Sequence, residues 1–281
     1  MSNGILCFAN NNGSINYIKQ AVELASRSKK YLNLPVSIVT STFDKLDIQY
    51  HDVFDKIIQI DDSQHNEKRY YDGQQRKTTL NFKNNERHNA FNLSPYDKTL
   101  VLDTDYIICN DKFKHSFQTN DNFQIYRHGV DLCSWRNYKE FDYINDKGIP
   151  FYWATCFYFT KSQESKIFFD LLRHLYHNWD HYSDVYDLAS RNFRNDHLFS
   201  MGIHIMNGFQ EGDWAKNLPG KMYYTLDRDI LCKIKDDSLT FLIQKEKLFN
   251  EYILSTVKGM NIHVMNKFSL GRAIDKEFEN E

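Results

Sequence analysis

The stretch Thr99-Leu100-Val101-Leu102-Asp103-Thr104-Asp105-Tyr106-Ile107-Ile108 decides the fold, because an apolar run ends in two acids that are two residues apart. Thr99 to Leu102 predicts a buried strand. Side chains at i and i+2 of an extended backbone leave the same face, so Asp103 and Asp105 can point at one spot. Two such carboxylates stay ionised together beside a cation, and Mn²⁺ or Mg²⁺ takes oxygen ligands and leaves positions open for a diphosphate. The alternative is a strand end whose acids cap a helix or pair with Lys or Arg.

The composition is that of a globular protein. With 281 residues, the chain has the length of one large α/β domain or two small ones. A hydrophobic fraction of 41% and an aromatic fraction of 15% predict a sizeable, largely aromatic core. The net charge of −2 gives no global electrostatic argument for binding nucleic acid or an anionic membrane.

The cysteines and the apolar runs indicate a cytoplasmic protein, of the host cell if the chain is viral. The 5 cysteines lie far apart with no C-x-x-C pair, which favours buried thiols over disulfides or zinc. Residues 4–9 read as a first strand and not as a signal peptide. The longest apolar stretch, Ile149 to Phe159, contains Pro and is too short for a membrane span.

The first hundred residues alternate between strand and helix patterns. Tyr17 to Leu32 has helical spacing, with Ser14 or Asn16 as its cap. A polar stretch from Asp61 to Asn89 predicts part loop and part helix. This alternation predicts a mostly parallel sheet with helices on both faces, and ligands bind beyond the carboxyl ends of such strands. The strands expected before Asp103 are Ile5–Ala9, Pro35–Thr40 and Lys56–Ile60.

Beyond Asp105 we expect two strands, Phe123–Tyr126 and Tyr152–Phe159, and then two helices. Ser162 caps the first helix, which carries an apolar stripe from Ile167 to Tyr182. The second helix runs from about Asp196 to Asn207, with Gly208 as its stop. The last hundred residues contain no linker or repeat, so residues 1–281 are predicted to form a single domain.

A family resemblance becomes specific on a few segments. The chain resembles GT-A-fold nucleotide-sugar glycosyltransferases, nearest to the soluble bacterial and viral type related to glycogenin and the lipopolysaccharide galactosyltransferases. The resemblance spans most of the chain and is weakest over residues 61–90 and 209–255. It implies a nucleotide-binding half (1–108) and an acceptor half (109–281) that ends in a metal- and phosphate-binding segment. The segments are Phe8-Ala9-Asn10-Asn11, Tyr17–Leu32, Pro35–Thr40 and Ser94-Pro95-Tyr96-Asp97-Lys98 leading into Asp103-Thr104-Asp105.

The resemblance also implies donor-binding residues. In that family the loop after the first strand grips the nucleoside, which implicates Ala9, Asn10 and Asn11. A basic residue before the acidic strand reaches the nucleotide or the sugar, and Arg87 fits by position; Thr104 lies within the acidic motif itself. The alternatives are a turn in which the asparagines bond their own backbone, and a solvated helix face for Arg87.

The same family has a late histidine as the third metal ligand, followed by a lysine that neutralises the diphosphate. Asn261-Ile262-His263-Val264-Met265-Asn266-Lys267 keeps this order, although H-x-x-x-K replaces the family spacing H-x-x-G-x-x-K. The metal set would be Asp103, Asp105 and His263. Asp196, in Arg194-Asn195-Asp196-His197, corresponds to an acid that bonds the donor sugar or deprotonates the acceptor; the alternative is a helix N-cap.

The resemblance implies transfer of a sugar, with UDP-sugar the expected donor, to an acceptor hydroxyl of a glycan or of hydroxymethylated bases in viral DNA. Arg76, Lys77, Lys83 and Arg87, with Phe82 between them, are a candidate phosphate-tracking patch. A nuclease or phosphatase needs further acids at strand ends, and a nucleotidylyltransferase needs a Gly-rich first loop, which Asn10 to Ser14 does not supply. Two alternatives stay open: a non-catalytic module that binds a nucleotide sugar or a glycan, and a metal-dependent nuclease or phosphatase, although no convincing second acidic cluster appears in the sequence.

Overall fold

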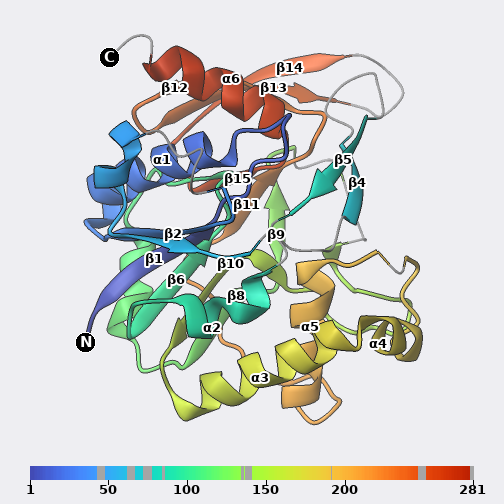
Figure 1. The fold of residues 1–281 in the computed structure, drawn as a ribbon. Helices are drawn as coiled ribbons and strands as arrows, with labels where there is room; N and C mark the ends of the chain where they lie inside the picture. The colour runs from blue at the N-terminus through green and yellow to red at the C-terminus, as the bar shows by residue number, and fades with distance from the viewer. Residues whose placement is uncertain are drawn as a thin grey trace.

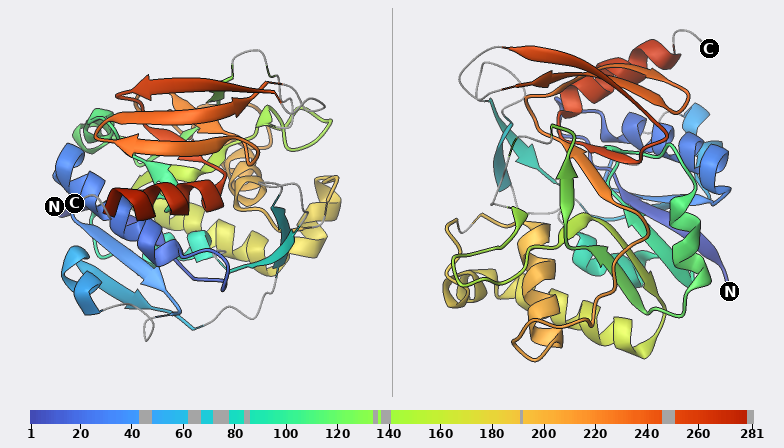
Figure 2. Two further views of the ribbon diagram at one scale, coloured as in Figure 1. Left: turned by 90° about the horizontal axis from the view of Figure 1, so that it is seen from above. Right: turned by 180° about the vertical axis from the view of Figure 1, so that it is seen from behind.

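A computed structural model gives the fold of the chain (Figure 1). It describes residues 1–42, 48–61, 67–71, 78–83, 86–133, 136, 141–190, 192–245 and 251–278. Figure 2 shows the same ribbon from above and from behind. The predicted patch residues Arg76 and Lys77, and the side chain of Phe82, lie outside the described part of the chain.

The centre of the molecule is a six-stranded sheet of order β3-β2-β1-β6-β10-β8. Strands β3, β2, β1 and β6 are parallel, and β10 runs antiparallel to both β6 and β8. The buried runs of β1, β2, β6 and β10 fit strands that are covered on both faces. This confirms the predicted α/β class with a mostly parallel sheet. The bounds are β1 Asn3–Phe8, β2 Val36–Thr40, β3 Lys56–Gln59, β6 Lys98–Leu102, β8 Phe123–Tyr126 and β10 Trp153–Thr160.

Helices cover both faces of this sheet (Figure 1). On one face, α1 (Tyr17–Arg27) packs against α6 (Lys267–Phe278); on the other, α3 (Gln163–His177) packs against α5 (Asn195–Met206). Asn16 caps α1 by accepting a hydrogen bond from the Lys19 N–H, and Ser162 caps α3 in the same way, both as predicted. The short helices are α2 Ala90–Leu93 and α4 Trp179–Val185.

Of the three smaller sheets in the described part of the chain, two have more than two strands. The first has the order β7-β15-β11-β9 and joins a segment just after the acidic motif to one near the C-terminus. The second is the antiparallel sheet β12-β13-β14, which packs on α6. The bounds are β7 Tyr106–Ile107, β9 Gly129–Asp131, β11 Met222–Thr225, β12 Ile230–Lys235, β13 Ser238–Gln244, β14 Tyr252–Lys258 and β15 Ile262–Val264.

Buried apolar side chains form two clusters. The larger lies around the main sheet and is rich in aromatic rings, as the composition predicted; Phe123, Phe157, Phe168 and Phe169 are among its fully buried members. The smaller joins the inner face of the β12-β13-β14 sheet to Leu270 and Ile274 of α6. The six-stranded sheet takes strands from both sides of residue 108.

Several local predictions need correction. The sequence predicts part loop and part helix from Asp61 to Asn89. The structure has a 3-10 helix at Glu86–Asn89, but it also has a hairpin of β4 (Glu67–Tyr71) and β5 (Thr78–Phe82). The polar composition of the stretch gave no sign of these two short strands. The helix after Ser162 ends at His177, and Ile167 at its supposed apolar stripe is half exposed. The helix from Tyr17 closes with a π-helical turn, Ser28–Leu32, before a left-handed Asn33.

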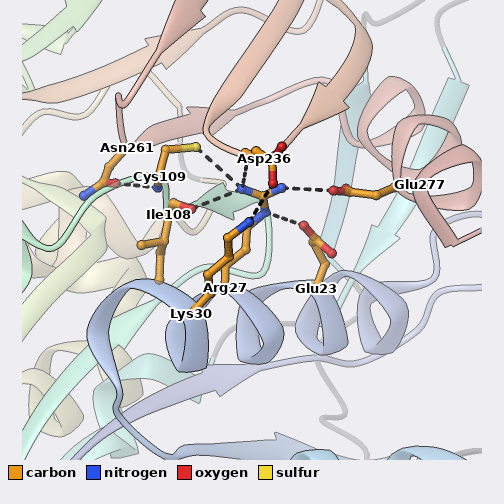
Figure 3. Close-up of polar contacts among 8 residues, drawn as sticks. All are labelled: Glu23, Arg27, Lys30, Ile108, Cys109, Asp236, Asn261 and Glu277. Atoms are coloured by element: carbon orange, nitrogen blue, oxygen red, sulfur yellow. Dashed lines mark hydrogen bonds and ion pairs between the residues drawn. The ribbon is translucent and has the colours of Figure 1, made fainter. Parts of the chain in front are cut away.

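The buried guanidinium of Arg27 connects the N-terminal helix to the C-terminal part of the chain (Figure 3). It pairs with Glu23 of its own helix and donates to the carbonyl of Ile108, to the carbonyl of Asp236 and to the carboxylate of Glu277. These groups come from α1, from the segment after β7, from the β12–β13 turn and from α6. One side chain therefore fixes α6 and the three-stranded sheet against α1.

All 5 cysteines are free thiols, and 4 of them are buried, as predicted. Burial raises the pKa of the Cys109 thiol to about 11. In the described part of the chain, no helix has the length and apolarity that a membrane span requires.

Candidate metal centre

The acidic motif begins where β6 ends. The Asp103 N–H donates to the carbonyl of Thr155 in β10 at 2.9 Å, and the Tyr106 N–H donates back to the Asp103 carbonyl at 3.1 Å. This turn closes directly into β7, so both acids lie at the carboxyl edge of the parallel sheet, as predicted. The carboxylate of Asp105 is fully buried, and that of Asp103 is mostly buried.

Strand β15 brings His263 to this edge. It pairs antiparallel with β7, with His263 opposite Tyr106, and the Val264 N–H donates to the Asp105 carbonyl at 2.9 Å. Asn261 secures the entry to β15, since its Oδ1 accepts from the N–H groups of Cys109 and Asn110 at 2.7 and 3.0 Å. As a result, His263 Nε2 lies 3.2 Å from Asp105 Oδ2.

Asp103, Asp105 and His263 together form a group that could hold a metal ion. One ligand atom from each lies within 4.8 Å of the others. The residues fit a cation, because Asp105 Oδ1 and His263 Nδ1 are buried and have no hydrogen-bond partner among the described residues. Buried polar atoms are normally paired, and a carboxylate-rich set suits Mg²⁺ and Mn²⁺.

Lys267 opens α6 and reaches the same carboxylate. Its Nζ lies 2.7 Å from Asp105 Oδ2. Burial alone would raise the pKa of the Asp105 carboxyl, but Lys267 and His263 outweigh burial and hold that pKa well below its usual range. Asp105 is therefore ionised at neutral pH, which a metal ligand requires.

Arg87 lies next to the other acid. Its guanidinium pairs with Asp103 Oδ1, and its side chain is buried, so the solvated-helix alternative for Arg87 is wrong. Burial raises the pKa of Asp103 to about 6; Arg87 offsets part of this effect and Asp105 adds repulsion. At neutral pH both carboxylates are charged, with a cationic side chain beside each.

The loop after β1 lies at the same edge of the sheet, but its polar groups bond within the protein. Asn10 Oδ1 accepts from the Ser41 N–H at 2.6 Å and its Nδ2 donates to the Lys83 carbonyl at 3.2 Å. Asn11 Oδ1 accepts from the Ile18 N–H at 3.2 Å, and Ala9 is fully buried. These asparagines shape the loop, and their contact with a nucleoside stays a prediction.

Thr104 is part of a buried polar chain that the sequence did not predict. Its hydroxyl donates to Gln20 Oε1 at 3.2 Å, and Gln20 Nε2 donates to the Lys267 carbonyl at 3.4 Å. Gln20 is 2% exposed in the middle of the apolar face of α1. A polar residue at a buried helical position was the available signal for this link between the acidic motif and α6.

Asp196 lies in the first turn of α5 and holds the adjacent strand. Its Oδ1 accepts from the Ala154 N–H at 3.0 Å, and its Oδ2 accepts from Arg194 at 3.3 Å. The N-cap position belongs to Arg194, whose side chain forms no capping bond, so the capping alternative for Asp196 is wrong. Ala154 precedes Thr155, the residue bonded to Asp103, which connects Asp196 to the acidic motif through β10.

Two aromatic rings that the sequence did not predict lie beside His263. Trp153 lies edge-on to the imidazole and Tyr106 lies parallel to it, each with ring centroids 6.4 Å away. Trp153 also packs against Tyr224 at 4.9 Å. A Cβ on Gly129 would lie 2.8 Å from the Trp153 ring, so this pair of rings needs a glycine in β9.

Comparison with known proteins gives structural likenesses alone, since no family model and no curated protein match the chain. It is similar to the glycosyltransferase GlyE of Streptococcus pneumoniae TIGR4 (12% identity, 78% of this chain and 45% of that one, TM-score 0.44). It is also similar to the galactosyltransferase LgtC with donor and acceptor sugar analogues (13%, 71% and 70%, TM-score 0.43) and to the bifunctional glycosyltransferase WbbM (13%, 62% and 34%, TM-score 0.38). The chain thus spans less than half the length of GlyE. Because the sequence identities and TM-scores are low, the function of the chain rests on the side chains of the site.

Proposed function

We propose that the chain is a metal-dependent glycosyltransferase that uses a nucleoside-diphosphate sugar. The observation that carries this proposal is the group of Asp103, Asp105 and His263, with ligand atoms within 4.8 Å at the carboxyl edge of a parallel sheet. Ligands of open α/β sheets bind at this edge. Asp105 Oδ1, which has no hydrogen-bond partner in the described part of the chain, further supports a cation in this position.

Sugar transfer breaks the bond between the anomeric carbon and the diphosphate, so negative charge develops on the leaving oxygen. The two acids and His263 would hold Mn²⁺ or Mg²⁺, which would supply Lewis-acid stabilisation of that charge. Lys267 adds a fixed positive charge at the same edge, and Arg87 holds Asp103 in place. These cationic groups are preorganised by buried contacts, which is the arrangement that stabilises a developing anion.

Asp196 is the candidate for contact with the donor sugar or the acceptor hydroxyl. It lies beside the strand that supports Asp103, and the exposed fraction of its side chain is 20%. An acid with this partial access can accept a hydrogen bond or a proton from a hydroxyl group. Ala9, Asn10 and Asn11 complete the proposed donor site on the side of the nucleoside.

The test is a screen of nucleoside-diphosphate sugars for release of the nucleotide, with and without Mn²⁺, against simple glycans, unmodified DNA and hydroxymethylated DNA. We expect metal-dependent release from one donor, with UDP-sugars first, and faster release with one acceptor class. A stabilising shift by nucleotide and metal without any turnover would favour the binding module. Release of nucleotides from DNA would favour a nuclease.

A further inference from the structure

Strand β14 exposes three consecutive large apolar side chains. Tyr252, Ile253 and Leu254 are 40%, 37% and 67% exposed. β14 is an outer strand of the β12-β13-β14 sheet, and Figure 2 shows it at the periphery of the molecule when seen from above. Consecutive exposed apolar residues on a sheet edge are a feature that soluble proteins avoid unless the edge has a partner.

The backbone of β14 shows which groups face outward. The Lys245 N–H donates to the Glu251 carbonyl and the Gly259 N–H donates to the Asp237 carbonyl, both at 2.8 Å, so odd-numbered residues turn toward β13. Because alternate residues of an antiparallel strand face opposite sides, the N–H and C=O groups of the even-numbered residues face outward. In the described part of the chain no strand pairs with this edge. The outward residues are Tyr252, Leu254, Thr256 and Lys258.

We propose that β14 pairs antiparallel with β14 of a second copy of this chain, so that two three-stranded sheets become one continuous sheet. Outward groups must meet outward groups, which restricts the pairing to registers that set even residues opposite even residues. Pairing about Ser255, the middle of β14, engages the strand over its whole length. It places Ile253 opposite Val257, Leu254 opposite Thr256 and Tyr252 opposite Lys258.

In this register the side chains of one β14 fit those of a second β14, and this fit favours a second copy of the chain as the partner. Ile253 and Val257 form an aliphatic cross-strand pair on the inner face. Tyr252 offers a ring to the Lys258 ammonium, and no two like charges meet. Ser255, a small side chain, lies on the two-fold axis. The neighbouring allowed register, about Leu254, would leave Lys258 beyond the end of the partner's strand.

The size of the contact sets the expected affinity. One strand edge is much smaller than the ~800 Å² per partner of a standard interface, so we expect dissociation on dilution below roughly tens of micromolar. Sedimentation velocity across that concentration range measures it. The wild type should shift from the mass of one chain to that of two.

Two variants should abolish this shift while keeping the fold. Leu254→Lys places a charge on the edge, and Thr256→Pro removes an outward N–H that β13 does not use. Ile167→Lys, at another exposed apolar residue on α3, is the matched control and should dimerise like the wild type. Two results would overturn the proposal. One is a wild type that sediments as a single chain at every concentration. The other is a Leu254→Lys variant that still forms dimers although its melting temperature equals that of the wild type.

Cross-linking tests the register directly. Residues opposite each other in a non-hydrogen-bonded antiparallel pair have Cα atoms about 4.5 Å apart, within reach of a disulfide. In a Cys232→Ser background, Ser255→Cys should oxidise to a covalent dimer, whereas Leu254→Cys should not. A covalent dimer in Leu254→Cys alone, or in neither variant at a concentration where sedimentation shows dimers, would contradict pairing about Ser255.

Discussion

Lys267 Nζ lies 2.7 Å from Oδ2 of Asp105, which makes the first residue of the last helix a direct partner of the acidic motif. The same carboxylate lies beside His263, and its second oxygen has no hydrogen-bond partner among the residues that the structure describes. The C-terminal segment therefore contributes both a candidate ligand and a charge to the centre.

Substitution of Asp103 or Asp105 by Asn should affect the stability of the metal-free protein differently, but each substitution should abolish metal binding. Asp105→Asn removes the partner of Lys267 and should lower the free energy of unfolding of the apoprotein by about 2 kcal/mol or more. Asp103→Asn relieves repulsion and should leave it nearly unchanged. Both variants should lose the rise in melting temperature that Mn²⁺ plus nucleoside diphosphate gives the wild type. Retention of that rise in either variant would remove the residue from the metal set.

His263→Ala and Lys267→Ala should separate metal binding from nucleotide binding. His263→Ala removes a ligand and should weaken Mn²⁺ binding in a titration at fixed nucleotide. Lys267→Ala should chiefly raise the nucleotide concentration needed at saturating Mn²⁺. Lys267→Arg keeps the charge and is the control. Identical, wild-type titrations for both alanine variants would show that the C-terminal segment has no part in the site.

Asp196→Asn should reduce turnover without loss of stability. The asparagine Oδ1 still accepts from the Ala154 N–H, so the melting temperature and nucleotide affinity should stay close to wild type. Turnover should fall about a hundredfold, the usual scale for a positioned acid or base. Asp196→Ala loses the bond to β10 and should in addition cost about 1 kcal/mol of stability. Normal turnover in Asp196→Asn would leave this residue a purely structural role.

Metal binding should strengthen as the pH rises through about 6, the value to which burial raises the pKa of Asp103. Below it the proton competes with the metal, and the apparent affinity should fall up to about tenfold per pH unit. The stability of the apoprotein should change in the opposite direction. The folded state binds the proton of the Asp103 carboxyl more tightly than the unfolded chain does, so the contribution of Asp103 to the free energy of unfolding falls as the pH rises from 3.8 to about 6. Isothermal titration with Mn²⁺ at several pH values measures the first effect, and affinity flat across pH 5 to 7 would contradict it.

Arg27→Met should destabilise the protein by about 3–5 kcal/mol, since it leaves the buried carboxylate of Glu23 without its partner. Lys30→Met is the matched control on the adjoining turn (Figure 3). The Lys30–Asp236 pair is exposed at both ends, so its loss should leave the free energy of unfolding close to that of the wild type. Chemical denaturation of the three proteins measures both values. Equal midpoints for Arg27→Met and wild type would show that the Arg27 contacts are dispensable.

The sequence predicted those parts of the molecule that depend on local patterns. A few neighbouring residues are enough to predict buried strands, helix caps and helix ends. Examples are the strand Leu100–Leu102, the caps Asn16 and Ser162, and the helix end at Gly208. The pairing of β15 with β7 depends on contacts between distant segments, and its location at the acids came from a family resemblance. The Thr104–Gln20 link and the rings around His263 had no local signal apart from a polar residue on an apolar helix face.

Asp105 and His263 are separated by 158 positions in sequence. The Val264 N–H bonded to the Asp105 carbonyl continues the pairing of β15 with β7, which brings the two residues together. Binding of a cation by these residues would therefore report whether β15 is paired with β7. Conditions that detach β15 from β7 would abolish coordination while the central strands persist. In a denaturant titration of the loaded protein, release of the ion should therefore come before, or together with, loss of the far-ultraviolet signal, and never after it.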